Sequence, residues 1–260
     1  MVVHLPHPVT TLYYRELGVI MPKSSKRYRE ISSQVDAAQR YSTEDAFNLL
    51  PQLTKAKFDE TVDVAIRLGV DPRKADQMVR GACELPHGTG RVVRVLVFAD
   101  GEAAQLATSA GADFVGTDEF IQKIQKENWL DFDKVVATRS MMPKIGRVAR
   151  VLGPRGLMPN PKVGTVVEAD KMSETIRALK AGKIDFRAEK NGGIIHTVIG
   201  KVSMGSDKLK DNFYALIAAL IRLKPVTAKG VYFRSITISS TMGPGIKIDT
   251  VDAHRNSERS

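Results

Sequence analysis

The chain has 260 residues and an apolar fraction of 43%, which excludes disorder throughout and leaves room for one large core or two modest ones. Its 39 Lys and Arg residues against 29 Asp and Glu give a formal net charge of +10, which favours contact with polyanions but does not choose between nucleic acid, an anionic membrane and a merely basic surface. A single cysteine, Cys83, excludes an intramolecular disulfide and a cysteine-cluster metal site, and it is consistent with a reducing cytoplasm.

The start of the chain shows no targeting signal. Residues 1–20 lack a basic front, a continuous apolar middle and a small-residue cleavage site. No apolar run approaches the roughly 20 residues that cross a bilayer, so we expect a soluble protein. Residues 1–20 are interpreted as an N-terminal extension, either flexible or the product of a misassigned start. The basic segment 22–29 is either a solvated terminus or an arm that contacts phosphate.

The next region predicts a helix and a strand. Ser42 to Asp45 is typical of a helix start, and Pro51 is a point where that helix kinks or ends early. Residues 61–68 alternate apolar and polar side chains, which predicts a strand with one buried face. Phe58 shares the parity of the buried set, so on pattern alone it is at least as much a core residue as a surface one. A short helix is expected after Asp71-Pro72.

A Leu-Pro-His-Gly cluster at 85–88 marks the first predicted domain boundary, and beyond it the pattern becomes that of an α/β unit. An apolar run at 92–99 predicts a buried parallel strand. Periodicity then predicts a helix at 103–107, a strand at 112–115, a helix at 118–129 and a strand at 134–138. A helix at 173–180 leads to the second boundary.

Between these elements, residues 143–167 predict a loop rich in Pro and Gly that presents backbone amides and guanidinium groups to phosphate. This segment holds five bases and no acid: Lys144, Arg147, Arg150, Arg155 and Lys162. It matches neither a Walker loop nor a dinucleotide fingerprint, because it lacks the GK[ST] ending and the three-glycine spacing. We therefore expect no nucleotide site.

Residues 182–202 predict a β-hairpin. Ile184, Phe186 and Ala188 alternate with charged residues, and Asn191-Gly192 permits a tight reversal. The second arm, 194–202, is expected to pair back antiparallel. The hairpin presents a cluster of basic side chains, namely Arg187, Lys190, His196 and Lys201.

The last part of the chain predicts a helix at 207–224, a strand at 231–240 and an irregular turn at 241–245. Strands on both sides of an α/β unit indicate a discontinuous first domain, joined to the inserted unit by two crossings that could act as a hinge.

The chemistry-bearing residues do not form a catalytic pattern. We find no nucleophile with a base, no paired acids and no metal-like spacing among the five histidines. We therefore expect no enzyme activity, no metal and no cofactor. We predict instead a binding surface formed by three segments: Lys57-Phe58 just before the strand at 61–68, the hairpin, and the 241–243 turn. There Gly243 would let a sugar-phosphate backbone come close, and the Thr241 hydroxyl would bond a 2′-OH or a phosphate.

Three stretches carry a family resemblance: LGPRGLMPNPKVGTV at 152–166, the predicted hairpin, and STMGPG at 240–245. Together they resemble the bacterial L-one family, the large-subunit ribosomal proteins of the mobile stalk, and the resemblance runs from about Met21 to Asp249. It implies an α/β fold. A discontinuous α+β first domain with antiparallel strands, residues 21–87 and 181–260, would bind folded 23S-type rRNA. A Rossmann-like α/β layer domain, residues 88–180, would be inserted into it.

The resemblance and the charge pattern together imply an RNA-binding set: Lys57, Phe58, Glu60, Thr61, Arg187, Lys190, Lys201, Thr241, Met242 and Gly243. Phe58, Glu60 and Thr61 match contact positions of the family, which shifts the interpretation of Phe58 from core to RNA. Phosphate contact is the role expected of Arg187, Lys190 and Lys201.

The resemblance also implies a cytoplasmic, ribosomal protein without a membrane partner. It would assist release of deacylated exit-site tRNA and repress translation of its own mRNA. Two alternatives come from other classes. A phosphate-handling α/β enzyme would need the nucleotide loop or acid pair that is absent here. A non-ribosomal RNA-binding regulator or chaperone would share the basic surface but would not sediment with large subunits.

Overall fold

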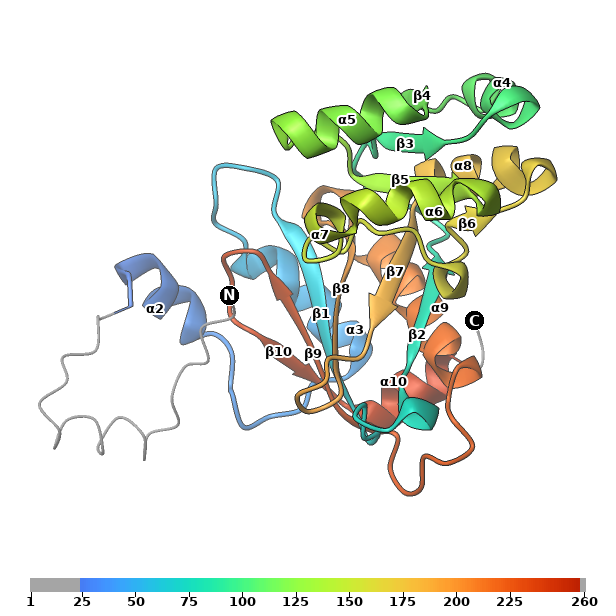
Figure 1. Ribbon diagram of the computed structural model, residues 1–260. Coiled ribbons are helices and arrows are strands. Elements are labelled where there is room, and N and C mark those ends of the chain that lie inside the picture. Colours follow the sequence, from blue (N-terminus) through green and yellow to red (C-terminus); the bar gives the residue numbers. More distant parts are fainter. Residues whose placement is uncertain (1–23, 258–260) are drawn as a thin grey trace, which may run out of the picture.

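The computed structural model describes residues 24–257, which contain three β-sheets and the helices that cover them (Figure 1). The predicted N-terminal extension, residues 1–20, lies outside the described residues, as does the beginning of the basic segment that follows it. The first described helix, α2 (Lys26–Ser32), covers the second half of that segment.

The first sheet combines strands from both ends of the chain in the order β10-β9-β1-β8, all antiparallel. Its strands are β1 (Thr61–Leu68), β8 (Ile194–Lys201), β9 (Phe233–Ser240) and β10 (Ile246–Ile248). The predicted alternation of β1 is confirmed, because Val62, Val64, Ile66 and Leu68 are all buried. Sequence reasoning missed β10, which has only three residues.

Three helices cover the apolar face of this sheet: α3 (Thr43–Leu49), α9 (Ser206–Arg222) and α10 (Thr250–Ser257). The helical spacing at 207–224 correctly predicted α9, whose apolar stripe of Leu209, Phe213 and Leu216 is buried. The predicted Pro51 effect also appears, since α3 ends at Leu49 and a 3₁₀ turn follows. Sequence reasoning missed α10.

The start of α3 gives the first testable prediction. The Ser42 side chain caps the helix by accepting a hydrogen bond from the Asp45 amide at 3.1 Å. Ser42→Ala removes that acceptor and is expected to lower the free energy of unfolding by about 1 kcal/mol, measured by urea denaturation. Ser42→Asn keeps an acceptor oxygen and should lose only a few tenths of a kcal/mol. Equal losses in the two variants would show that the cap contributes nothing.

The predicted hairpin is wrong in its pairing. Its first arm, β7 (Lys183–Arg187), pairs with β2 (Arg80–Glu84) in a separate two-stranded sheet, whereas its second arm, β8, joins β1. At the turn between the arms, the Glu189 amide donates to the Ile194 carbonyl at 2.8 Å. Gly192 and Gly193, with φ of 88° and 64°, carry the reversal. The alternation of apolar and charged residues indicates that one face of a strand is buried, but it does not identify the partner strand. The pairing of the two arms was therefore predicted wrongly.

The partner strand β2 explains a second error. A short helix was expected after Asp71-Pro72, but only Ala75–Gln77 forms a 3₁₀ turn, η2, and a strand follows. Cys83 on β2 is buried and forms no disulfide, so it serves the core as a small apolar residue.

The third sheet is parallel, in the order β4-β3-β5-β6, and it confirms the predicted α/β pattern. Its strands are β3 (Val95–Phe98), β4 (Phe114–Gly116), β5 (Lys134–Thr138) and β6 (Val166–Val167). Helices α4 (Gly101–Ser109) and α8 (Met172–Ala181) contribute to the hydrophobic cluster on one face, and α5 (Asp118–Glu127) to that on the other. The predicted apolar run starts too early, because Val92 is 87% exposed.

The first part of the basic segment 143–167 is helical rather than a loop, whereas residues 153–160 lie outside any helix or strand. It contains α6 (Met142–Ile145), α7 (Ala149–Leu152) and, later, the 3₁₀ turn η5 (Pro161–Val163). Ile145, Val148 and Leu152 are buried at helical spacing, a signal hidden by the Gly and Pro around them. The remaining 3₁₀ helices are η1 (Leu50–Leu53), η3 (Arg139–Met141), η4 (Gly146–Val148), η6 (Ala169–Lys171) and η7 (Val202–Met204).

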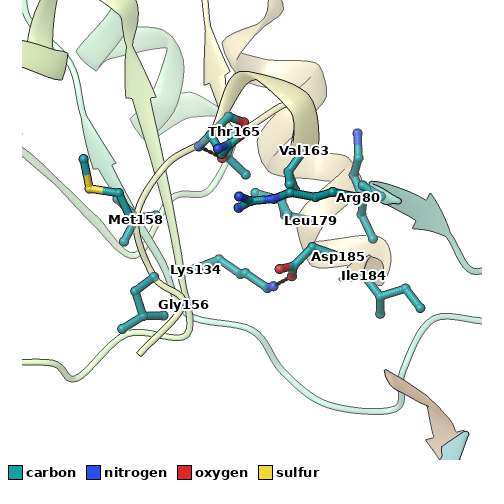
Figure 2. A pocket seen from close by; sticks show the side chains of 14 residues that line it. Arg80, Lys134, Gly156, Met158, Val163, Thr165, Leu179, Ile184 and Asp185 are labelled. Carbon is teal, nitrogen blue, oxygen red and sulfur yellow. Dashed lines mark hydrogen bonds and ion pairs between the residues drawn. The ribbon is translucent and has the colours of Figure 1, made fainter. Parts of the chain in front are cut away.

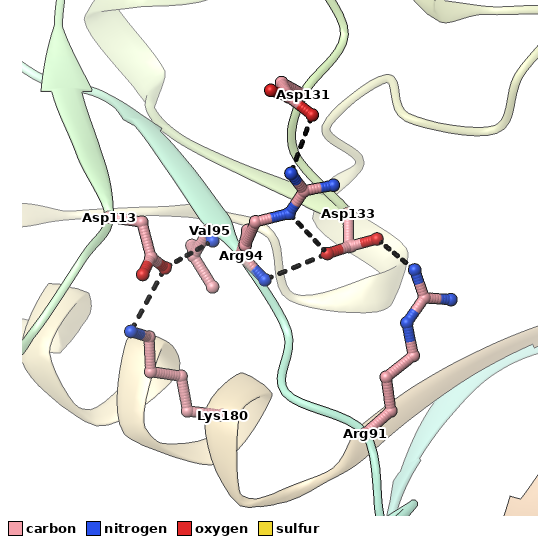
Figure 3. A network of polar contacts seen from close by, with 7 residues as sticks. All are labelled: Arg91, Arg94, Val95, Asp113, Asp131, Asp133 and Lys180. Atoms are coloured by element: carbon pink, nitrogen blue, oxygen red, sulfur yellow. Dashed lines mark hydrogen bonds and ion pairs between the residues drawn. The ribbon is translucent and has the colours of Figure 1, made fainter.

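The two chain crossings between the antiparallel and parallel sheets run side by side. A Cβ on Gly182 would lie only 2.4 Å from the Gly88 Cα, so no other residue fits at 182 without displacing the neighbouring backbone. Beyond Gly88, Arg91 and Arg94 bond the Asp133 carboxylate at 2.5 and 3.3 Å and so tie the crossing to the start of β5 (Figure 3). The carboxylate is held ionised, because these guanidinium groups and the Arg94 amide lower the pKa of Asp133 against the opposing effect of burial.

The hydrophobic clusters draw on different parts of the chain. One cluster draws on residues between 31 and 85 and between 184 and 253, whereas the other two draw only on residues 95–179. The division into a discontinuous domain at 21–87 and 181–260 and an inserted domain at 88–180 stays a prediction.

Candidate nucleic-acid interface

Three segments that are far apart in the sequence meet at one end of the first sheet. They are the loop before β1, the end of β8, and the turn between β9 and β10 (Figure 1). The Thr61 amide donates to Thr241 Oγ1 at 3.0 Å, and the Thr241 amide donates to the Thr61 carbonyl at 3.0 Å. The Val202 amide donates to the Glu60 carbonyl at 3.0 Å. We call residues 57–61, 201–203 and 241–243 together the three-segment surface.

Glu60 holds the three-segment surface together from inside. Its side chain is only 1% exposed, and its carboxylate accepts hydrogen bonds from the Met242 amide at 2.9 Å and the Ala56 amide at 3.3 Å. A buried carboxylate bound to two backbone amides fixes the positions of both segments. Glu60 was expected to contact RNA, but the structure turns its carboxylate inward, so it positions Met242.

Thr241 and Gly243 also serve the turn itself. The Thr241 hydroxyl both accepts from the Thr61 amide and donates to the Thr61 carbonyl, so its proton is not free for a ligand. A Cβ on Gly243 would lie 2.5 Å from Ser240 Oγ, so a larger residue at 243 would require this serine hydroxyl to rotate away. The interpretation in which Gly243 makes room for RNA stays a prediction. Ser240 Oγ is buried and has no hydrogen-bond partner among residues 24–257.

What the surface offers to a ligand is two large apolar side chains. Phe58 is 55% exposed and Met242 is 46% exposed, on segments that Glu60 ties together. The alternative that placed Phe58 in the core is wrong. An exposed phenyl ring on a fixed backbone is suited to stack on a nucleic-acid base. Lys57 beside it is exposed, and Lys201 is half-buried.

The charge of the surface is nearly balanced. Lys57 and Lys201 stand against Asp59 and Glu60. Lys201 Nζ donates to the Asp59 carbonyl at 3.0 Å, and Ser203 Oγ donates to the Asp59 carboxylate at 2.7 Å. The bond from Ser203 lowers the pKa of Asp59, so this carboxylate is ionised at neutral pH. Shape and apolar contact, rather than attraction by net charge, are therefore what this surface can use. Sequence reasoning missed the Asp59–Ser203 pair, since no motif marks it.

Arg187 and Lys190 lie elsewhere. Thr61 pairs with Lys201 at one end of β1, whereas Arg67 pairs with Ile194 at the other end, just after the turn that carries Lys190. Six strand residues separate these rows by about 20 Å. The expectation that Arg187 and Lys190 share one surface with Thr241 and Gly243 is therefore wrong. The reason is that the two hairpin arms diverge into different sheets.

Metal-binding clusters and membrane-spanning helices are both absent from the described residues. Within residues 24–257, no cluster of three or more His, Cys, Asp or Glu side chains could hold a metal ion. The same part of the chain contains no helix with the length and apolar character needed to cross a membrane.

Comparison with known proteins gives a consistent answer. Residues 50–244 match the model of a family that is described as the Ribosomal protein L1p/L10e family. A large ribosomal subunit protein uL1 from Cutibacterium acnes is 57% identical over 231 residues, which cover 89% of this chain and 98% of the relative. A protein of the same description from Bdellovibrio bacteriovorus is 53% identical over 226 residues, 87% of this chain and 95% of the relative.

These matches confirm the resemblance inferred from the motifs at 152–166 and 240–245, and they assign the chain to ribosomal proteins rather than to enzymes. The chain belongs to the Ribosomal protein L1p/L10e family.

Proposed function

We propose that this chain is a component of the large ribosomal subunit that binds folded 23S-type rRNA of the mobile stalk through the three-segment surface. The observation that carries the proposal is the exposure of Phe58 and Met242 on segments locked together by the buried Glu60 carboxylate. The relatives named large ribosomal subunit protein uL1 support it.

The physical basis is preorganisation. A surface whose backbone is already bonded in place loses little conformational entropy when RNA binds, so weak contacts add up to useful affinity. Phe58 would stack on an unpaired base, and Met242 would fill an apolar gap beside it. Lys57, which makes no ion pair within residues 24–257, would contact a phosphate. Because the surface carries little net charge, we infer that it selects a folded RNA by shape.

The same proposal includes movement. Gly88 and Gly182 lie in contact at the two crossings, so both connections between the proposed domains bend at one place. Hinges are formed by a few such residues that absorb changes in φ and ψ. Rotation there would let the 88–180 domain move with the stalk as deacylated tRNA leaves the exit site. A surface that recognises an rRNA fold would also bind a copy of that fold in the chain's own mRNA and repress its translation.

The test compares two RNAs across a salt series. The full chain should bind a stalk rRNA fragment more tightly than an unrelated duplex of equal length, and the preference should persist as salt rises, since salt weakens phosphate attraction for both. A preference that disappears at high salt would contradict shape recognition. Sedimentation of the chain in cell extracts separates the alternatives, because a free regulator or chaperone would stay away from large subunits.

A further inference from the structure

The two-stranded sheet of β2 and β7 has one apolar and one charged face. Cys83, Ile184 and Phe186 face the hydrophobic core. The other face carries three cross-strand rows: Glu84 with Lys183, Ala82 with Asp185, and Arg80 with Arg187. Two of these rows have compensated charge. Lys183 Nζ lies 3.5 Å from Glu84, and Asp185 is paired with Lys134 from β5. The third row is two arginines.

Neither arginine of that row is neutralised by the protein. Within residues 24–257, the guanidinium groups of Arg80 and Arg187 form no ion pair and no hydrogen bond. Like charges directly opposite on neighbouring strands destabilise a sheet. Burial and the charge of Arg187 together lower the pKa of Arg80, which is the expected sign for a cation held near another cation. Such an arrangement becomes favourable when an anion lies between the two groups.

The segment that faces this row adds positive charge. The 3₁₀ turn η5 packs against β2 and carries the exposed Lys162. From residue 139 to residue 167 the chain has six bases and no acid, namely Arg139, Lys144, Arg147, Arg150, Arg155 and Lys162. No carboxylate of this segment can therefore compensate the arginine row.

The geometry also indicates where an anion would sit. Arg80 lines a cavity of about 30 Å³ together with Gly156, Val163 and the Lys134–Asp185 pair, and Figure 2 shows its side chain extending into that space. This volume has room for about two water molecules, so a phosphate group does not fit inside. It would bind at the outer edge, between Arg80 and the exposed Arg187, on the side of β2 against which η5, the turn that carries Lys162, packs.

We propose that Arg80, Arg187 and Lys162 form a second site on this chain, which binds a phosphate of the RNA backbone. The proposal rests on the proposed function, because the RNA is the one held by the three-segment surface about 20 Å away along β1. Guanidinium groups bind phosphate oxygens through paired N–H donors, which suits two arginines that face each other. The first surface then supplies shape recognition, and the arginine row supplies the charge that the first surface lacks.

The test uses the full chain and the stalk rRNA fragment. Arg187→Gln should weaken binding about 3- to 10-fold near 0.1 M salt and reduce the log-log salt slope by about 0.7 to 0.9, which is one phosphate contact. Arg80→Gln should do the same. Lys126→Gln, which removes one exposed positive charge from α5, is the control and should change neither value. Phe58→Ala should weaken binding but leave the slope unchanged.

The outcomes separate the two proposals. If the wild-type chain shows no preference for stalk RNA, the proposed function fails. If the wild type is specific but Arg187→Gln behaves like Lys126→Gln, the second site is refuted. A thermal-shift series with inorganic phosphate distinguishes the source of the anion. Stabilisation by phosphate that Arg187→Gln abolishes, with RNA affinity unaltered, would overturn the assignment to RNA. Increased stability of Arg187→Gln without phosphate, together with the loss of slope, supports it, because repulsion is relieved as the contact disappears.

Discussion

Met242→Asp is expected to raise the dissociation constant for stalk rRNA about 100-fold while the free energy of unfolding stays within about 0.5 kcal/mol of the wild type. Met242 is half exposed, and its backbone amide donates to the buried Glu60 carboxylate, so we expect the fold to depend little on its side chain. An aspartate at this point removes an apolar contact and places a negative charge against RNA. A factor of 100 corresponds to about 2.7 kcal/mol, which is within the range of one lost base contact plus charge repulsion.

The measurement is a binding titration at fixed salt, paired with urea denaturation of the same variant. Met242→Leu is the matched control, because it keeps the apolar character and nearly the volume, and it should change the dissociation constant less than 3-fold. If Met242→Asp binds as well as Met242→Leu, the turn is structural only and the three-segment surface is not the RNA site.

Glu60→Ala is expected to damage both stability and binding. The substitution leaves the amides of Met242 and Ala56 without their acceptor, because both donate to the buried Glu60 carboxylate. We expect the free energy of unfolding to fall by about 2 to 3 kcal/mol. RNA affinity should fall about 10-fold as well, because Met242 and the loop before β1 lose their fixed positions and must be ordered on binding.

Glu60→Gln distinguishes positioning from direct contact. Its single carbonyl oxygen can accept from the Met242 amide, so this variant should recover most of the binding but only part of the stability. Thermal or urea unfolding gives the stability, and the same titration gives the affinity. If Glu60→Ala loses affinity with no loss of stability, the carboxylate contacts RNA itself, contrary to its buried geometry.

Much of the fold could be predicted because its signals are local. The alternation of β1, the apolar run that contains β3, and the stripe of α9 each follow from a periodic pattern that a single element imposes on its own residues. The helix start at Ser42 was predictable for the same reason, because a cap involves residues three apart.

The errors arose where a residue's role depends on a distant partner. The two arms around Gly192-Gly193 are adjacent in sequence but belong to different sheets, because β2 and β1 supply better neighbours. The segment 143–167 was expected to be a loop from its Gly and Pro, but burial of Ile145, Val148 and Leu152 against the parallel sheet makes its first part helical, up to residue 152.

The amino-acid sequence by itself determined the class of fold, the family and the motif-bearing segments, because these depend on residue order and local periodicity. Only the tertiary structure decided which residues act together. It buried the Glu60 carboxylate and brought Phe58 and Met242 to one surface. It also placed Arg187 opposite Arg80 instead of beside Thr241. The physical reason is that hydrogen bonds and burial link residues 180 positions apart as readily as neighbours, and these links leave no periodic pattern along the chain.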